Sequence, residues 1–197
     1  MDYLKYFVFI INIFLFSNNV FCDNINKIFY SPNNINKIEY EGMDRHGVGT
    51  YYNNYKHNKN KILTIELGAI GPQINWHGDY IAEIYNYLGT NFHHSYFYLY
   101  KYNKLTPQIN QVIYVIPDME IIFDCNDWVH INIRSLVSNR ILQTIEFEGI
   151  NGNFLGSKNL FNNVEITKDE ILIWIDIEPY TYKILENPIL YRFRRMF

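Results

Sequence analysis

The chain has 197 residues, a formal net charge of −3 at pH 7 and a pI near 6.1. The length fits one domain that can bury a substantial core, and the acidic balance argues against a nucleic-acid-binding protein, which would carry a basic face. The bias toward Asn, Ile, Tyr, Lys and Phe is typical of a protein from an AT-rich genome. We find no repeat period in the sequence.

Residues 1–22 have the pattern of a secretory signal peptide. Lys5 precedes an apolar run over residues 6–16, and polar residues then lead to a cleavage position before Asp23. The run has the length of a signal core, about 7–15 residues, and is shorter than the roughly 20 residues that span a membrane. We therefore expect a secretory-pathway protein that is secreted, cell-surface-associated or vacuolar, with no transmembrane segment in the mature chain. An uncleaved anchor is the alternative.

The segment 23–60 is rich in Asn and contains several Gly residues, which predicts a poorly structured leader or linker. A removable transit segment that ends near Lys61 is the alternative, although its acidic residues weaken a plastid interpretation. We expect a β-rich globular domain over residues 61–186. Residues 187–197 form a basic-aromatic tail in this interpretation.

Beyond residue 60, alternating apolar and polar residues predict strands, and the interval 79–89 predicts a helix. Ile81, Ile84, Tyr85 and Leu88 fall at helical spacing in that interval, between a capping Asp79 and a terminating Gly89. The predicted strands cover residues 61–67, 95–102, 111–116, 120–124, 128–133, 140–147 and 170–178. The chain is therefore expected to be mainly β, an antiparallel β-sandwich or barrel of about seven to nine strands with one short helix.

Four tyrosines share one face of the predicted strand 95–102. Tyr96, Tyr98, Tyr100 and Tyr102 alternate with Phe97 and Leu99. Such a ladder could be a stacking platform for sugars or for a partner chain, since tyrosine combines apolar area with a polar tip. The alternative is a face that a neighbouring strand covers.

Histidine and aspartate residues flank the predicted helix. His77 and Asp79 precede it, and His93 follows it, so the three could ligate a metal ion. No metalloprotease spacing is present, and ordinary loop residues are the alternative. We accordingly expect no cofactor.

Cys125 is the single thiol of the mature chain if cleavage removes Cys22. No cationic residue lies next to it, which favours a structural thiol over a reactive one. An intermolecular disulfide is the alternative.

No catalytic motif is visible, neither a Gly-x-Ser-x-Gly sequence nor a phosphate-binding loop. The leading hypothesis is a secreted protein-interaction or adhesive β-sandwich module without catalytic activity, for which parasite–host contact or invasion is one setting. Its expected partner is another protein, such as a surface or vacuolar membrane protein. One alternative is a secretory-pathway hydrolase that uses Glu146, Glu148 or the His77 group, and another is an organelle-targeted structural subunit.

Overall fold

The computed structural model describes residues 23–55, 58–68, 70–89, 92–127, 130–146, 161–177 and 184–197. The predicted signal peptide, residues 1–22, lies outside these ranges. None of the helices in this part of the chain is long and apolar enough to cross a membrane.

The described residues form sixteen strands and two short 3-10 helices, and the strands are arranged as four antiparallel sheets. Sheet A contains β1 (Asn24–Tyr30), β2 (Lys37–Met43), β3 (Val48–Tyr55) and β4 (Asn58–Glu66). Sheet B contains β5 (Gln73–His77), β6 (Ile81–Gly89), β7 (Phe92–Leu99), β8 (Lys104–Leu105) and β9 (Ile109–Asn110). Sheet C contains β10 (Val112–Ile116), β11 (Ile121–Asp127), β12 (His130–Ser135) and β13 (Ile141–Glu146). Sheet D contains β14 (Asn163–Ile166), β15 (Glu170–Ile177) and β16 (Ile184–Arg194).

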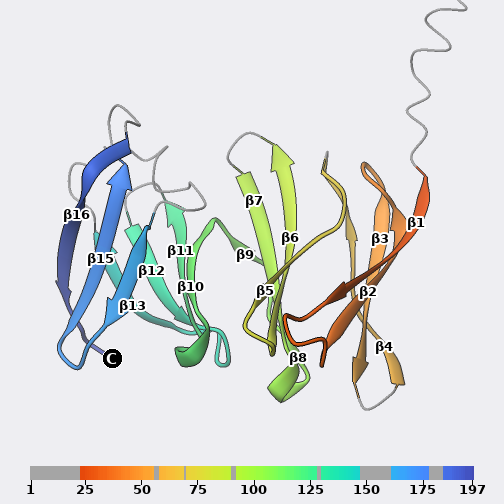
Figure 1. Ribbon diagram of the computed structural model, residues 1–197, viewed down its shortest axis with the longest axis horizontal. Helices are drawn as coiled ribbons and strands as arrows, with labels where there is room; N and C mark the ends of the chain where they lie inside the picture. Colours follow the sequence, from red (N-terminus) through yellow and green to blue (C-terminus); the bar gives the residue numbers. More distant parts are fainter. Residues whose placement is uncertain are drawn as a thin grey trace, which may run out of the picture.

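The four sheets follow one another in the sequence and stand in a row (Figure 1). The strands of each sheet pair largely in chain order, so each sheet is close to a simple meander. Successive meanders packed face to face resemble successive blades of a β-propeller. Sheets A and D lie at opposite ends of the row, so the described sheets do not close into a ring. The mainly β, antiparallel prediction is confirmed, but the strands outnumber the predicted seven to nine.

Three buried apolar layers hold the row together. The A/B layer consists of Ile38, Tyr40, Tyr51, Leu67, Ala82, Ile84, Tyr98 and Tyr100. The B/C layer consists of Ile81, Phe97, Leu99, Ile109, Val112, Ile122 and Leu136. The C/D layer consists of Ile113, Ile121, Phe123, Cys125, Ile131, Ile133, Ile145, Phe161, Ile171, Ile173 and Ile175. Sheets B and C are therefore covered on both faces, as in the interior of a layered domain.

The predicted helix over residues 79–89 is wrong, because residues 81–89 form strand β6 at the centre of sheet B. Its neighbours β5 and β7 pair with it on both sides. Both faces of this strand are buried, so four consecutive residues, Ile81, Ala82, Glu83 and Ile84, are inaccessible. Burial on both faces removes the period of two that marks a half-exposed strand, and the remaining apolar pattern resembles a helix.

Two segments expected to lack structure are strands. Residues 24–55 and 58–66 form sheet A, contrary to the expected leader over residues 23–60. The expected tail, residues 187–197, contributes to β16, which pairs with β15 from Glu170↔Arg194 to Ile177↔Ile184. Composition alone predicts too little structure for the Asn-rich segment 23–60. Cross-strand pairing and the buried tyrosines of sheet A stabilise strands that the composition does not indicate.

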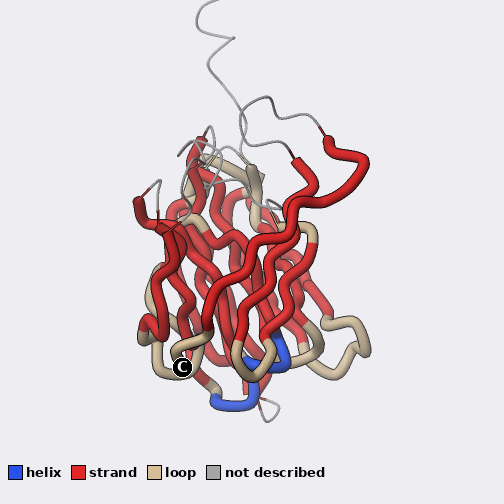
Figure 2. Tube along the Cα trace, turned by 90° about the vertical axis from the view of Figure 1, so that its left-hand side faces the viewer, coloured by secondary structure: helices blue, strands red, loops and turns tan. Residues whose placement is uncertain are grey.

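Two 3-10 helices, η1 (Tyr100–Tyr102) and η2 (Pro117–Met119), lie along the same edge of the sheets, the lower edge in Figures 1 and 2. Each ends at a residue in the left-handed conformation, Asn103 with φ of 47° and Glu120 with φ of 54°. They turn the chain sharply out of β7 and β10, and η1 shapes the site described next.

Candidate functional site

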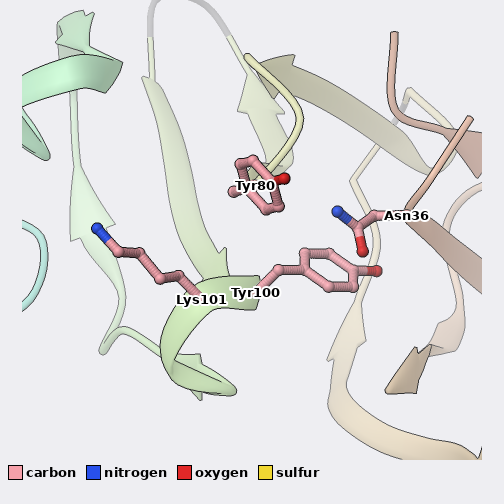
Figure 3. Close-up of a pocket in the computed structure, with 4 residues that line it drawn as sticks. All are labelled: Asn36, Tyr80, Tyr100 and Lys101. Atoms are coloured by element: carbon pink, nitrogen blue, oxygen red, sulfur yellow. The ribbon is translucent and has the colours of Figure 1, made fainter. Parts of the chain in front are cut away.

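A pocket of about 470 Å³ opens beside η1, where the β1–β2 loop meets the β5–β6 turn. Its lining includes Asn36, Tyr80, Tyr100 and Lys101. Figure 3 shows the rings of Tyr80 and Tyr100 in the middle, with Asn36 on one side and Lys101 extending to the other. The site thus combines two aromatic rings with an amide and an ammonium group.

The β5–β6 turn is fixed to the β1–β2 loop through Asp79. The Asn33 N–H donates a hydrogen bond to Asp79 Oδ1 at 3.0 Å, and Asn36 Nδ2 donates to the Asp79 carbonyl at 2.7 Å. Gly78 has a φ of +63°, the left-handed conformation that glycine adopts without strain. These bonds join sheets A and B at the rim of the pocket and hold the Asn36 amide in place.

Tyr100 is a rigid part of the pocket wall, because its side chain is only 6% exposed. Its ring centroid lies 4.8 Å from that of Tyr98 in an edge-on contact and 5.7 Å from that of Trp76. The Tyr100 hydroxyl donates a hydrogen bond to the Lys37 carbonyl. Burial raises the pKa of this hydroxyl well above its usual value, so it stays protonated and keeps donating at neutral pH.

Tyr80 contrasts with Tyr100, because it is 54% exposed although its carbonyl accepts a hydrogen bond from the Tyr100 N–H at 2.9 Å. The backbone is therefore anchored while the ring remains accessible to solvent. An exposed aromatic ring on a fixed backbone loses little conformational entropy on binding, which favours its use as a contact residue.

Lys101 forms the charged side of the pocket and contacts Tyr102 and Glu120 next to it. Its Nζ lies 3.4 Å from Glu120 Oε1, and the Tyr102 hydroxyl donates to the same carboxylate at 2.9 Å. The hydrogen bond with Tyr102 and the charge of Glu120 raise the pKa of Lys101 above its ordinary value. Lys101 therefore carries a full positive charge at neutral pH, in a mostly exposed position where a partner could exchange for Glu120.

The predicted tyrosine ladder does not form one continuous face. β7 ends at Leu99, so only Tyr96 and Tyr98 lie on a strand, and Tyr100 and Tyr102 lie in η1. Tyr98 is buried in the A/B layer, where it accepts a hydrogen bond from Asn53 and donates one to Asn103. Tyr96 is half-buried and donates to Gln108 at 2.7 Å, while Tyr102 is exposed.

Of the four predicted tyrosines, only Tyr100 lines the pocket, and the sequence analysis missed Tyr80. The sequence signal for Tyr80 is its position directly after Gly78 and Asp79. Glycine and aspartate favour tight turns, so an aromatic residue there is exposed at a hairpin end.

The structure does not bring His77, Asp79 and His93 together. His77 pairs with Ile81 at one end of sheet B, and His93 pairs with Tyr87 at the other. Six residues along β6 separate these positions, or about 20 Å at the usual strand rise. Asp79 is engaged in the β1–β2 contact, and His93 is buried with its Nε2 3.1 Å from the Val112 carbonyl.

His77 instead faces a buried carboxylate. Its Nε2 lies 3.0 Å from Glu83 Oε2, and the Glu83 side chain is only 1% exposed. Ser95 Oγ donates to Glu83 Oε1 at 2.6 Å, and Asn75 Nδ2 donates to Oε2 at 3.2 Å. In a catalytic triad the serine would donate to the histidine, whereas this serine donates to the carboxylate. The network fits the need of a buried charge for several partners.

A second buried carboxylate, Asp124, belongs to sheet C. Arg134 Nε lies 2.7 Å from Asp124 Oδ2, and Asn132 Nδ2 donates to Oδ1 at 3.2 Å. Thr144 Oγ1 donates in turn to Asn132 Oδ1 at 2.9 Å. This chain of bonds ties β11, β12 and β13 together and leaves Asp124 fully paired, which is the condition for a tolerated buried charge.

The remaining predicted site residues lie apart from the pocket. Cys125 is buried in the C/D layer and forms no disulfide within the described residues. An intermolecular disulfide would require that layer to open. Glu146 is exposed at the end of β13, and Glu148 lies outside the described residues.

Within the same described ranges, no group of three or more His, Cys, Asp or Glu side chains is placed to hold a metal ion. No protein-family model matches the chain, and no curated protein is significantly similar to it in sequence.

Proposed function

We propose that this protein is a secreted interaction or adhesive module that binds a segment of a partner protein in the Tyr80–Tyr100 pocket. The observation that carries the proposal is the pairing of an exposed Tyr80 with a buried, immobilised Tyr100. Tyrosine is among the residues most enriched at binding hot spots, which cluster in small pockets with a polar rim. Asn36 and Lys101 supply such a rim.

The chemistry of the pocket selects the kind of segment. The two rings offer apolar contact area, Asn36 offers an amide, and Lys101 offers a cation held beside a single carboxylate. A partner segment with an aromatic or aliphatic side chain next to an acidic one would fill the pocket and compete with Glu120 for Lys101. The partner would be a surface or vacuolar membrane protein if the predicted secretory signal is used.

The test places a photoreactive benzoylphenylalanine at position 80 in the cell that makes the protein. We expect a discrete adduct with one partner, which mass spectrometry identifies. The same label at Val48, which is 59% exposed on sheet A, is the matched control and should give no such adduct. Sequencing the mature N-terminus of the same material tests the secretory part, since a start at Asp23 is expected.

The identified partner is then titrated against purified variants. Tyr80→Ala should weaken binding at least ten-fold, a loss typical of an interface hot spot. It should also change the free energy of unfolding by no more than about 0.5 kcal/mol, since the ring is exposed. Val48→Ala should leave binding unchanged. Equal crosslinking at both positions, or full affinity of Tyr80→Ala, would contradict the proposal.

A further inference from the structure

Sheets A and D close the two ends of the row, and their outer faces differ. The outer face of sheet A carries an ionic network, in which Lys37 and Lys59 lie 2.8 and 3.2 Å from the Glu39 carboxylate and Lys59 also contacts Glu41. A polar outer face is what keeps the terminal unit of a stacked array soluble. Ile28 and Tyr30, which pair with Glu39 and Lys37, lie on the same face and are about half exposed, so on this face apolar side chains are interspersed with paired charges.

The outer face of sheet D is apolar at its centre. Ile171, Ile173 and Ile175 are fully buried on the inner face, so the alternating residues Leu172 and Trp174 lie on the outer face. Leu190 pairs with Trp174 across β15 and β16 and lies on the same side. All three are half-buried, and none belongs to a buried apolar layer of the described residues.

Charges of opposite sign flank this apolar centre. Glu165 on β14 pairs with Leu172 on β15, and Leu172 pairs with Arg192 on β16. Glu165, Leu172 and Arg192 therefore lie side by side in one row across the outer face, and both charged residues are exposed. The acidic position belongs to one edge strand and the basic position to the other. Arg192 Nη1 also lies 3.2 Å from Glu170 Oε2 on β15 of its own copy, so an acidic side chain of a second copy would share Arg192 with Glu170.

We propose that two copies of the chain associate through the outer faces of sheet D, about a two-fold axis parallel to β15. A half-turn about such an axis places β14 of one copy opposite β16 of the other. Each Glu165 then faces an Arg192 of the second copy, and the leucines and tryptophans of the two central strands meet. An axis perpendicular to the strands would instead oppose acid to acid and base to base, so the charge pattern selects the first arrangement.

The contact extends the packing already present in the row, since sheets B and C are covered on both faces in the same way. The three strands of sheet D are about 4.8 Å apart and about 25 Å long, so the projected area of its outer face is roughly 350 Å². Specific, stable interfaces bury about 800 Å² of accessible surface per partner, so this area is less than half of the usual value and suits a weak, transient contact. We therefore expect reversible, concentration-dependent dimers rather than permanent ones. This inference does not depend on the proposed partner pocket.

Sedimentation equilibrium of the purified protein, up to low-millimolar concentration, tests the proposal with variants that reverse the charge at position 165 or at position 192. The wild type should form dimers, and E165R and R192E should each weaken self-association at least ten-fold, because each opposes like charges twice. An equimolar mixture of E165R and R192E should regain association, since both contacts then pair opposite charges. Circular dichroism checks that each variant is folded.

Lys59→Glu, at the other end of the row, is the matched control and should leave self-association unchanged. Trp174→Gln removes the apolar centre and should also weaken the dimer, which gives a second test if one charge variant is unfolded. The proposal is overturned if the wild type stays monomeric, if Lys59→Glu rather than the sheet D variants abolishes association, or if the mixture does not regain it.

Discussion

The A/B and C/D layers bury their sheets with different side chains. The A/B layer relies on Tyr40, Tyr51, Tyr98 and Tyr100, whereas the C/D layer is built largely from isoleucines, with Phe123 and Phe161. A buried tyrosine needs a hydrogen-bond partner for its hydroxyl, and isoleucine needs none. Within the described residues, the Tyr51 hydroxyl and the Trp76 indole N–H are buried without such a partner.

This contrast separates an almost entirely apolar layer from the layer that carries the proposed binding pocket. The buried side chains of the C/D layer are apolar apart from the Cys125 thiol, so stability here depends mainly on burial and close packing of methyl groups and rings. The A/B layer combines rings with scattered polar groups, and at its edge Tyr100 becomes the wall of the pocket. The predictions below test this division in order of decreasing effect.

Ile173→Ala should produce the largest change. The side chain is fully buried in the C/D layer, and its truncation should lower the free energy of unfolding by about 2–5 kcal/mol. Urea denaturation measures the loss. Leu172→Ala, at the adjacent outward-facing position, is the control and should cost clearly less. Equal losses would mean that the C/D layer is not the stabilising layer.

Tyr98→Phe should destabilise the protein less than Ile173→Ala, because it removes a hydrogen-bonding hydroxyl but leaves the ring in place. The substitution removes the hydroxyl that links Asn53 and Asn103 and leaves both amides short of a partner. We expect the free energy of unfolding to fall by about 1–3 kcal/mol. Tyr102→Phe, which removes an exposed hydroxyl, should be nearly neutral. No loss in Tyr98→Phe would show that these bonds contribute nothing net to the A/B layer.

Acid should weaken sheet A through Glu39. Hydrogen bonds from Lys37, Asn54 and Lys59 lower the pKa of this carboxyl from its ordinary value of 4.5 to about 2. Because the folded-state pKa is the lower one, the stabilisation is complete above about pH 5 and is lost as the pH falls toward 2. Solvent screening limits it to the order of 1 kcal/mol.

The measurement is thermal unfolding of wild type and Glu39→Gln across this pH range. The difference between the two proteins should be constant near neutral pH and disappear at the acid end. A difference that persists to pH 2 would show that the carboxylate charge is not its source.

Tyr51→Phe should have the smallest effect and the opposite sign. Its hydroxyl is buried without a partner within the described residues, so removing it also removes an uncompensated desolvation. We expect no loss of stability and a gain of up to about 1 kcal/mol, measured by urea denaturation beside Tyr98→Phe. A clear loss would mean that the hydroxyl has a partner, such as an ordered water.

The strand-forming segments with one regular alternation were predictable from the sequence. The sequence predicts a strand over residues 170–178, and β15 confirms it, with Ile171, Ile173 and Ile175 buried on one face. Here one face is buried in the C/D layer and the other is not. A strand shows alternating apolar and polar residues in its sequence only when one of its faces is buried and the other is not.

The secondary-structure predictions were wrong where both faces of a strand are buried and where a segment is rich in Asn. β6 resembled a helix because sheets A and C cover it on opposite sides. Sheet A resembled a linker because few of its residues are fully buried, namely Ile38, Tyr40 and Tyr51 on strands β2 and β3. The residues of the predicted tyrosine ladder show the same limit. Tyr98 and Tyr100 belong to the alternating pattern of the predicted ladder, but their burial depends on sheet A, which is remote in the chain.

The sequence by itself determined the antiparallel β class, several strand positions and the candidate aromatic residues, because these depend on local propensity and period. Only the tertiary structure decided that four meanders stack in a row, that Tyr80 rather than Tyr96 joins Tyr100 in a pocket, and that His77 faces Glu83. These features depend on contacts between sheets that are distant in the chain. No local pattern encodes which face of one meander meets which face of the next.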